Sequence, residues 1–172
     1  KGTAHQPATM VFAGKVLADL VRLIKGDRYR SRLISKIMFG AYNKRIKNVR
    51  TVNDWLTRDE AVVDEYNAGK LTTFLFTVNG YRGLMNMILY VRKPRNIERI
   101  PKNLPMLMIS GLDDPVGEYG KGVYRAYNSY HGHIDDIDLR LYEDCRHELC
   151  NELNKEEIYE EIYGWIMNHM SK

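Results

Sequence analysis

The 172-residue sequence contains only two cysteines, Cys145 and Cys150, and no stretch of 18 apolar residues. Two cysteines exclude a disulfide scaffold and favour a reducing compartment, so we expect a cytoplasmic location. The lack of a long apolar stretch excludes an ordinary transmembrane helix. Apolar residues make up 44% of the chain and charged residues 28%, a balance that excludes a disordered protein. The length favours a single domain.

Positive and negative charges are unevenly distributed along the chain. Residues 1–50 contain 12 Lys and Arg against 2 Asp and Glu, whereas residues 101–172 contain 7 against 14. A basic surface of this kind is typical of proteins that bind nucleic acid or anionic lipid, although it also suits an ordinary solvated helical face. The alternative function is therefore a non-catalytic binding module that uses the basic N-terminal third. No nucleic-acid motif is present, so nucleic acid is not an expected partner.

Helical periodicity dominates the first hundred residues. Apolar residues recur every three to four positions over residues 10–24 and again over residues 31–40, which predicts two helices. Thr57 begins a capping-box pattern that predicts a third helix, and Asn79 is a candidate cap for a fourth. Residues 71–78 suit either an extended chain or a helix.

The pattern changes after Pro101. Residues 104–110 form a short apolar run that is typical of a buried parallel strand, and residues 138–142 predict a second strand. A helix is expected between them, over residues 119–130, and Asn154 is expected to cap a last helix. The alternation of strand and helix predicts a parallel sheet with right-handed crossovers, and therefore an α/β fold.

Two acidic residues and one histidine follow the predicted strands. Asp113 and Asp114 come directly after the first strand, and His147 follows the second. Neighbouring parallel strands are about 4.8 Å apart, so a carboxylate and an imidazole at their carboxyl ends can form a hydrogen bond. Such a carboxylate fixes the histidine tautomer and frees the other ring nitrogen as a general base. A helix-capping Asp and a structural His are the alternative interpretations.

Two segments closely resemble the last strand–loop units of α/β-hydrolases. They are L-P-M-L-M-I-S-G-L-D-D-P at residues 104–115 and L-Y-E-D-C-R-H-E-L-C-N-E at residues 141–152. The most similar group is that of monoacylglycerol lipases and lysophospholipases, also called the serine aminopeptidase S33 or hydrolase-4 family. The resemblance implies that Asp114, rather than Asp113, is the catalytic acid and that His147 is the catalytic base.

The resemblance also implies how the chain is divided. Residues 1–8 correspond to the end of a core sheet strand and its exit loop, residues 9–100 to a helical cap, and residues 101–172 to the C-terminal part of the hydrolase core. The implied activity is hydrolysis of acyl esters through an acyl-enzyme, without a cofactor or metal. The implied partner is a small acyl ester or lysolipid, and membrane contact is at most transient. The exact acyl substrate stays open.

The sequence contains no G-x-S-x-G, the motif that carries the serine nucleophile in this family. The resemblance therefore implies that the nucleophile-bearing N-terminal half of the fold is missing from the chain and is a required partner. Loss of a triad nucleophile costs on the order of 10⁶ in turnover. We expect the 172 residues alone to be inactive.

Two further groups of residues are weaker candidates. Trp55, Leu56, Phe74 and Phe76 offer apolar surface for an acyl chain, although they can equally form the small core of the cap. The spacing C-x-H-x-x-C over residues 145–150 supplies three candidate metal ligands, whereas structural zinc usually has four, so we expect no metal.

Overall fold

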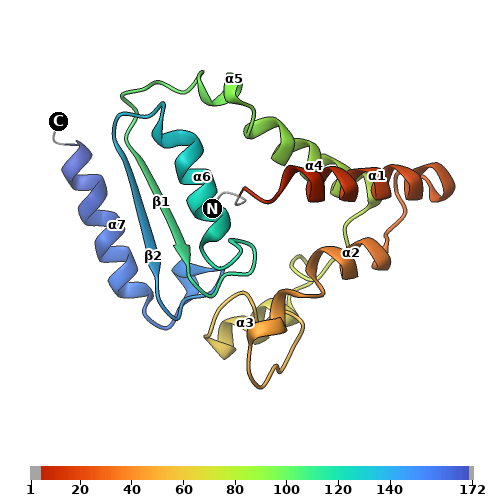
Figure 1. Ribbon diagram of the computed structural model, residues 1–172. Coiled ribbons are helices and arrows are strands. Elements are labelled where there is room, and N and C mark those ends of the chain that lie inside the picture. Colours follow the sequence, from red (N-terminus) through yellow and green to blue (C-terminus); the bar gives the residue numbers. More distant parts are fainter. Residues whose placement is uncertain (1–4, 171–172) are drawn as a thin grey trace.

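The computed structural model describes residues 5–170, which form two parts of different architecture (Figure 1). We call residues 8–97 the helical segment and residues 106–170 the α/β segment. The helical segment consists of α1 (Ala8–Lys25), α2 (Arg32–Phe39), the 3₁₀ helix η1 (Tyr42–Arg45), α3 (Glu60–Ala68), α4 (Val78–Val91) and α5 (Pro94–Ile97). The α/β segment consists of β1 (Met106–Gly111), α6 (Lys121–His131), β2 (Ile137–Tyr142), the 3₁₀ helix η2 (Leu149–Asn151) and α7 (Lys155–Met170).

The helices expected from periodicity are present, but the prediction assigned two of their N-terminal caps to the wrong residues. The cap of α3 is Asp59, whose carboxylate accepts a hydrogen bond from the Ala61 amide. Thr57 lies two residues before this cap, and its hydroxyl donates to the carbonyl oxygen of Asn151 at 2.7 Å and accepts from the Asp59 amide at 3.1 Å. The capping-box pattern thus placed the cap two residues too early, because the side chain of Asp59 is the one that reaches the first free amides of the helix.

The start of α4 also differs from the prediction. Thr77, rather than Asn79, caps this helix, and its hydroxyl accepts from the Gly80 amide at 3.1 Å. Thr77 also forms an isolated antiparallel bridge with Arg30. Residues 71–78 thus form a turn followed by extended chain, and the helix begins only at Val78.

The helical segment has its own small core. Helices α1 and α4 pack side by side along most of their length, and α2 closes one end of the pair (Figure 1). The buried residues at this junction are Ala18, Ile34, Val78 and Tyr81. This core is built from side chains of three helices and is separate from the core of the α/β segment.

The α/β segment contains the predicted parallel sheet, which has two strands in the described chain. β1 and β2 pair in parallel from Met106 opposite Ile137 to Gly111 opposite Tyr142. In Figure 1, α6 and α7 lie on opposite sides of the strand pair, and Ile158 of α7 is fully buried. The carboxyl ends of both strands point toward the part of the helical segment that contains α3.

The strand end expected at residues 1–8 falls partly outside the described residues, which begin at His5. His5, Gln6 and Pro7 belong to neither helix nor strand, and α1 begins at Ala8. The His5 amide donates to the Gly122 carbonyl at 3.2 Å, so this stretch lies against the start of α6. Within residues 5–170, no helix combines the length and apolar character that crossing a bilayer needs.

Candidate active site

Asp114 and His147 meet where the two parallel strands end. Asp114 lies three residues after β1, His147 lies five residues after β2, and Nδ1 of His147 is 3.0 Å from Oδ2 of Asp114. A carboxylate can only accept a hydrogen bond, so Nδ1 carries a proton, and in the neutral ring this leaves the lone pair on Nε2. The pair therefore has the arrangement in which the free ring nitrogen can act as a base.

Burial distinguishes Asp114 from its neighbour Asp113. The Asp114 side chain is 8% exposed, and its second carboxylate oxygen accepts from the Val116 amide at 2.8 Å. Asp113 is exposed, and its backbone amide donates to the carbonyl of Cys145. The buried carboxylate is the one that faces the histidine, and the neighbouring residue contributes only its main chain to the same loop.

Residues 54–58 of the helical segment lie along the loop that carries His147. The His147 amide donates to the Trp55 carbonyl at 3.4 Å, and the Glu148 amide donates to the Leu56 carbonyl at 2.6 Å. The Trp55 ring also contacts the His147 ring, with 5.1 Å between the ring centroids. The backbone and one face of the histidine are thus held by the helical segment.

An ion pair with a fully buried carboxylate lies behind the same loop. Glu152, whose side chain is 0% exposed, accepts from Nε of Arg58 at 2.8 Å. Sequence reasoning missed both residues. A glutamate close to the start of a charged helix and an arginine in a polar loop have the same local pattern as surface charges, so only the fold reveals that Glu152 is buried and that Arg58 is its partner.

Tyr42 is a further residue that the sequence did not reveal. Its ring packs edge-on against Trp55 with 4.9 Å between centroids. Burial, followed by the negative charge of Asp114, raises the pKa of Tyr42. The guanidinium of Arg45, from the same 3₁₀ helix, lies 3.6 Å over the ring of Tyr119 in the loop after Asp114. The helical segment therefore contacts the loops of both Asp114 and His147.

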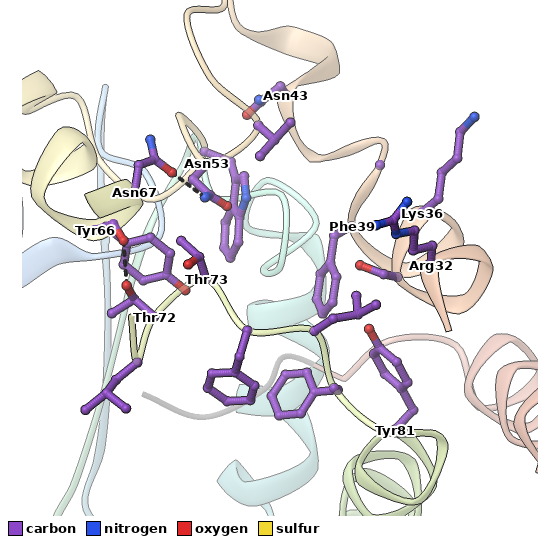
Figure 2. Close-up of a pocket in the computed structure, with 18 residues that line it drawn as sticks. Arg32, Lys36, Phe39, Asn43, Asn53, Tyr66, Asn67, Thr72, Thr73 and Tyr81 are labelled. Carbon is purple, nitrogen blue, oxygen red and sulfur yellow. Dashed lines mark hydrogen bonds between the residues drawn. The ribbon is translucent and has the colours of Figure 1, made fainter. Parts of the chain in front are cut away.

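A cavity of about 830 Å³ opens in the helical segment (Figure 2). Trp55, Phe74 and Phe76 line it, as do Phe39 and Tyr81, which Figure 2 shows on the wall opposite Tyr66. Leu56 does not line the cavity, and only 3% of it is exposed. Trp55 connects this cavity to His147 because its ring contacts both.

The basic stretch that suggested an anionic partner is partly engaged within the chain. Nη2 of Arg50 donates to both carboxylate oxygens of Asp64 in α3, at 2.9 and 3.0 Å. Arg45 lies over Tyr119, and Arg22 is 3.9 Å from Asp27. These cations serve contacts inside the chain, which weakens the case for a dedicated anion-binding surface.

One group of residues in the described chain brings metal-ligand atoms together. The group consists of Asp136, Asp138 and His169, whose ligand atoms lie within 4.8 Å of one another. It lies at the opposite end of β2 from His147. The C-x-H-x-x-C residues do not form such a group in residues 5–170, because Cys145 is buried, with its Sγ 3.4 Å from Oδ1 of Asn154, whereas Cys150 is exposed.

Comparison with protein families identifies the relatives of this chain. The family model of serine aminopeptidase S33, also called hydrolase-4, matches residues 5–154. The chain belongs to the S33 family. The match extends over the helical segment as well as over both strands, so Asp114, His147 and the residues that surround them lie within the family region.

Solved structures share the fold of this S33 family member. A thermostable carboxyl esterase from Bacillus coagulans, solved with glycerol, is 20% identical, with a TM-score of 0.81 over 98% of the chain and 54% of the esterase. A lipase in its open form is also 20% identical, with a TM-score of 0.82 over 99% and 56%. A monoacylglycerol lipase from Paleococcus ferrophilus is 17% identical, with a TM-score of 0.61 over 98% and 55%.

The chain therefore spans about half the length of these solved structures. Its fold is mixed α/β and corresponds to about half of an α/β-hydrolase. A search of curated protein sequences found no match.

Proposed function

We propose that this S33 chain is the C-terminal part of a serine ester hydrolase, in which His147 is the general base and Asp114 orients it. The observation that supports the proposal best is the 3.0 Å hydrogen bond between the buried carboxylate of Asp114 and Nδ1 of His147. The two groups lie at the carboxyl ends of neighbouring parallel strands, where ligands of open α/β sheets bind. The serine nucleophile belongs to the part of the fold that the chain does not contain.

The proposed reaction has two steps. In the first, the serine oxygen bonds to the acyl carbon while its proton moves to Nε2 of His147, and the alcohol then leaves with that proton. In the second, a water molecule gives its proton to Nε2 and bonds to the acyl carbon, and the acid leaves as the serine regains its proton. Asp114 stabilises the imidazolium that forms in each step.

We further propose that residues 9–100 form the cap over the site, that residues 101–172 belong to the hydrolase core, and that residues 1–8 are the end of a core sheet strand and its exit loop. The proposed substrate is an ester with an apolar acyl chain that enters the cavity lined by Phe74 and Phe76. Trp55 lies where such a chain would pass from the cavity to His147. A yeast monoglyceride lipase of similar fold, solved with a substrate analogue, is consistent with a small ester ligand.

The test compares two histidine variants of the natural protein that joins this chain to its serine-bearing part. His147→Ala should lower ester hydrolysis by a factor on the order of 10⁶ and abolish labelling by a fluorophosphonate probe. His131→Ala, an exposed histidine on α6, should leave both unchanged. Full labelling of the His147→Ala protein would refute the proposed role. The isolated 172 residues should show neither turnover nor labelling.

A further inference from the structure

Glu152 holds two separate parts of the molecule with one buried carboxylate. Its Oε2 accepts from Nε of Arg58 at 2.8 Å, and its Oε1 accepts from the backbone amide of Arg146 at 2.7 Å. Arg58 belongs to the helical segment, and Arg146 directly precedes His147 in the α/β segment. Removal of the charge would change the environment of both donors at once, because neither oxygen is accessible to water.

The bond to Arg146 acts on the backbone next to the histidine. The amide of Arg146 is fixed by Glu152, while its guanidinium donates to the carbonyl oxygens of Asp54 at 2.7 Å and Thr57 at 3.0 Å. Both the main chain and the side chain of the residue before His147 therefore have defined partners. Because these bonds hold the backbone next to His147, they also determine the direction in which the His147 side chain projects.

Further bonds connect the same two stretches of chain. The Glu148 amide donates to the Leu56 carbonyl at 2.6 Å, and the Thr57 hydroxyl donates to the Asn151 carbonyl at 2.7 Å. Arg58 also reaches Oδ1 of Asn154 at 2.8 Å through its Nη2. Residues 54–58 and 146–154 thus form a continuous hydrogen-bonded unit, with the carboxylate of Glu152 as its buried centre.

We propose that Glu152 is a positioning residue for His147, through which the helical segment and the His147 ring are coupled. The inference rests on the proposed function, since it assigns a role in the reaction that His147 is proposed to perform. Glu152 does not contact the reacting atoms and acts through the Arg146–His147 backbone. When the pairing of Arg58 with Glu152 is broken, His147 loses its alignment with Asp114.

The first test observes the His147 ring by NMR in the isotopically labelled natural protein that joins this chain to its serine-bearing part. The proton that Nδ1 donates to Asp114 gives a downfield signal, which the variant His147→Gln assigns. In Glu152→Gln, which keeps the shape of the side chain, we expect that signal to be lost and amide exchange at His147 and Glu148 to become at least roughly tenfold faster. The control Glu156→Gln, at an exposed position in α7, should change neither.

Arg58 provides the second arm of the test. Arg58→Lys keeps the charge but lacks the Nε donor, so the same loss of the His147 signal is expected in a folded chain. Since both substitutions act on the bond between Arg58 and Glu152, the double variant should show less than the sum of the two single effects. An unchanged His147 signal in Glu152→Gln overturns the proposal. If that variant fails to fold, an unchanged signal in Arg58→Lys overturns it instead.

Activity separates this proposal from the proposed function. In the natural protein, Glu152→Gln should lower kcat about 10²-fold with little change in KM, and Glu152→Asp should recover part of the loss. A natural protein without any ester turnover would refute the proposed function, while the NMR experiment would still decide whether Glu152 positions His147. A fall in activity with an intact His147 signal would assign Glu152 a purely structural role and overturn the proposal.

Discussion

The α-carbon of Gly111 lies against the main-chain carbonyl of Cys145, so closely that a β-carbon at residue 111 would be 2.0 Å from the carbonyl oxygen. The same β-carbon would lie 2.4 Å from the carbonyl oxygen of Arg146. Gly111 ends β1 and leads into the loop of Asp114, whereas Cys145 and Arg146 lead into His147. The two loops can approach each other only because residue 111 has no side chain.

We expect Gly111→Ala to destabilise the chain and to separate Asp114 from His147. Backbone atoms form the obstacle, so the loops must move apart, at a cost of about 1–3 kcal/mol for overpacking. Gly164→Ala is the matched control, because nothing lies within 4 Å of its β-carbon, and alanine should stabilise the interior of α7 by up to about 1 kcal/mol. Chemical denaturation of both variants measures the difference. Equal stability of the two would contradict the close approach.

Exchange of a carboxylate for an amide should affect the two neighbouring aspartates very differently. Asp114→Asn removes the charge that fixes the His147 tautomer, and we expect kcat of the natural protein to fall by about 10⁴. Asp113→Asn alters an exposed side chain and should leave kcat within about twofold, as is usual for surface substitutions. Steady-state ester hydrolysis provides the measurement. If Asp113→Asn, rather than Asp114→Asn, abolished activity, Asp113 would be the catalytic acid.

The cavity predicts a dependence on acyl-chain length. Phe74 lines the cavity with about half of its surface exposed, so Phe74→Ala should remove contact with a long acyl chain. We expect kcat/KM for a long-chain ester to fall roughly tenfold and that for a butyrate ester to change little, since a buried aromatic side chain contributes about 1.5–3 kcal/mol.

The control for this experiment is Leu104→Ala, at a similarly exposed apolar residue that does not line the cavity. It should leave the preference between the two esters unchanged. An equal response of both esters to Phe74→Ala would show that acyl chains do not occupy the cavity.

His5 should make the stability of the chain depend on pH. Burial, followed by the positive charges of Arg92 and Arg125, lowers the pKa of His5 below its usual 6.5 in the folded chain. The unfolded chain then binds a proton more readily, so stability is fully present above pH 6.5 and is lost as the pH falls toward the lowered value. Denaturation midpoints should therefore decrease as the pH is lowered through this range.

The variant His5→Gln isolates this contribution, because the other histidines remain. Its midpoints should fall less with decreasing pH than those of the parent chain. His131→Gln, which changes an exposed histidine, should follow the parent curve. Identical pH dependence of His5→Gln and the parent would show that His5 does not carry the effect.

The sequence allowed the helices, the parallel strands and the meeting of Asp114 with His147 to be predicted, because each depends on local periodicity or on strand ends. The caps Thr57 and Asn79 were predicted wrongly, since each lies two residues from another residue with a capping side chain, Asp59 and Thr77, and the local pattern does not choose between the two. The bond between Arg58 and Glu152 could not be predicted because the residues are 94 positions apart and charge alone does not indicate burial.

That separation also determines when the site can form. The hydrogen bonds between residues 54–58 and residues 146–154 close loops of about ninety residues. Closing such a loop has a higher entropic cost than forming α1 or α4, and is therefore slower. During synthesis, Arg58 leaves the ribosome long before Glu152 exists, and its guanidinium stays hydrated until then. Alignment of His147 is therefore expected late in folding, and it requires the chain to continue past Glu152 to Ile158 of α7, whose buried side chain packs in the same core as Cys145 and Leu149.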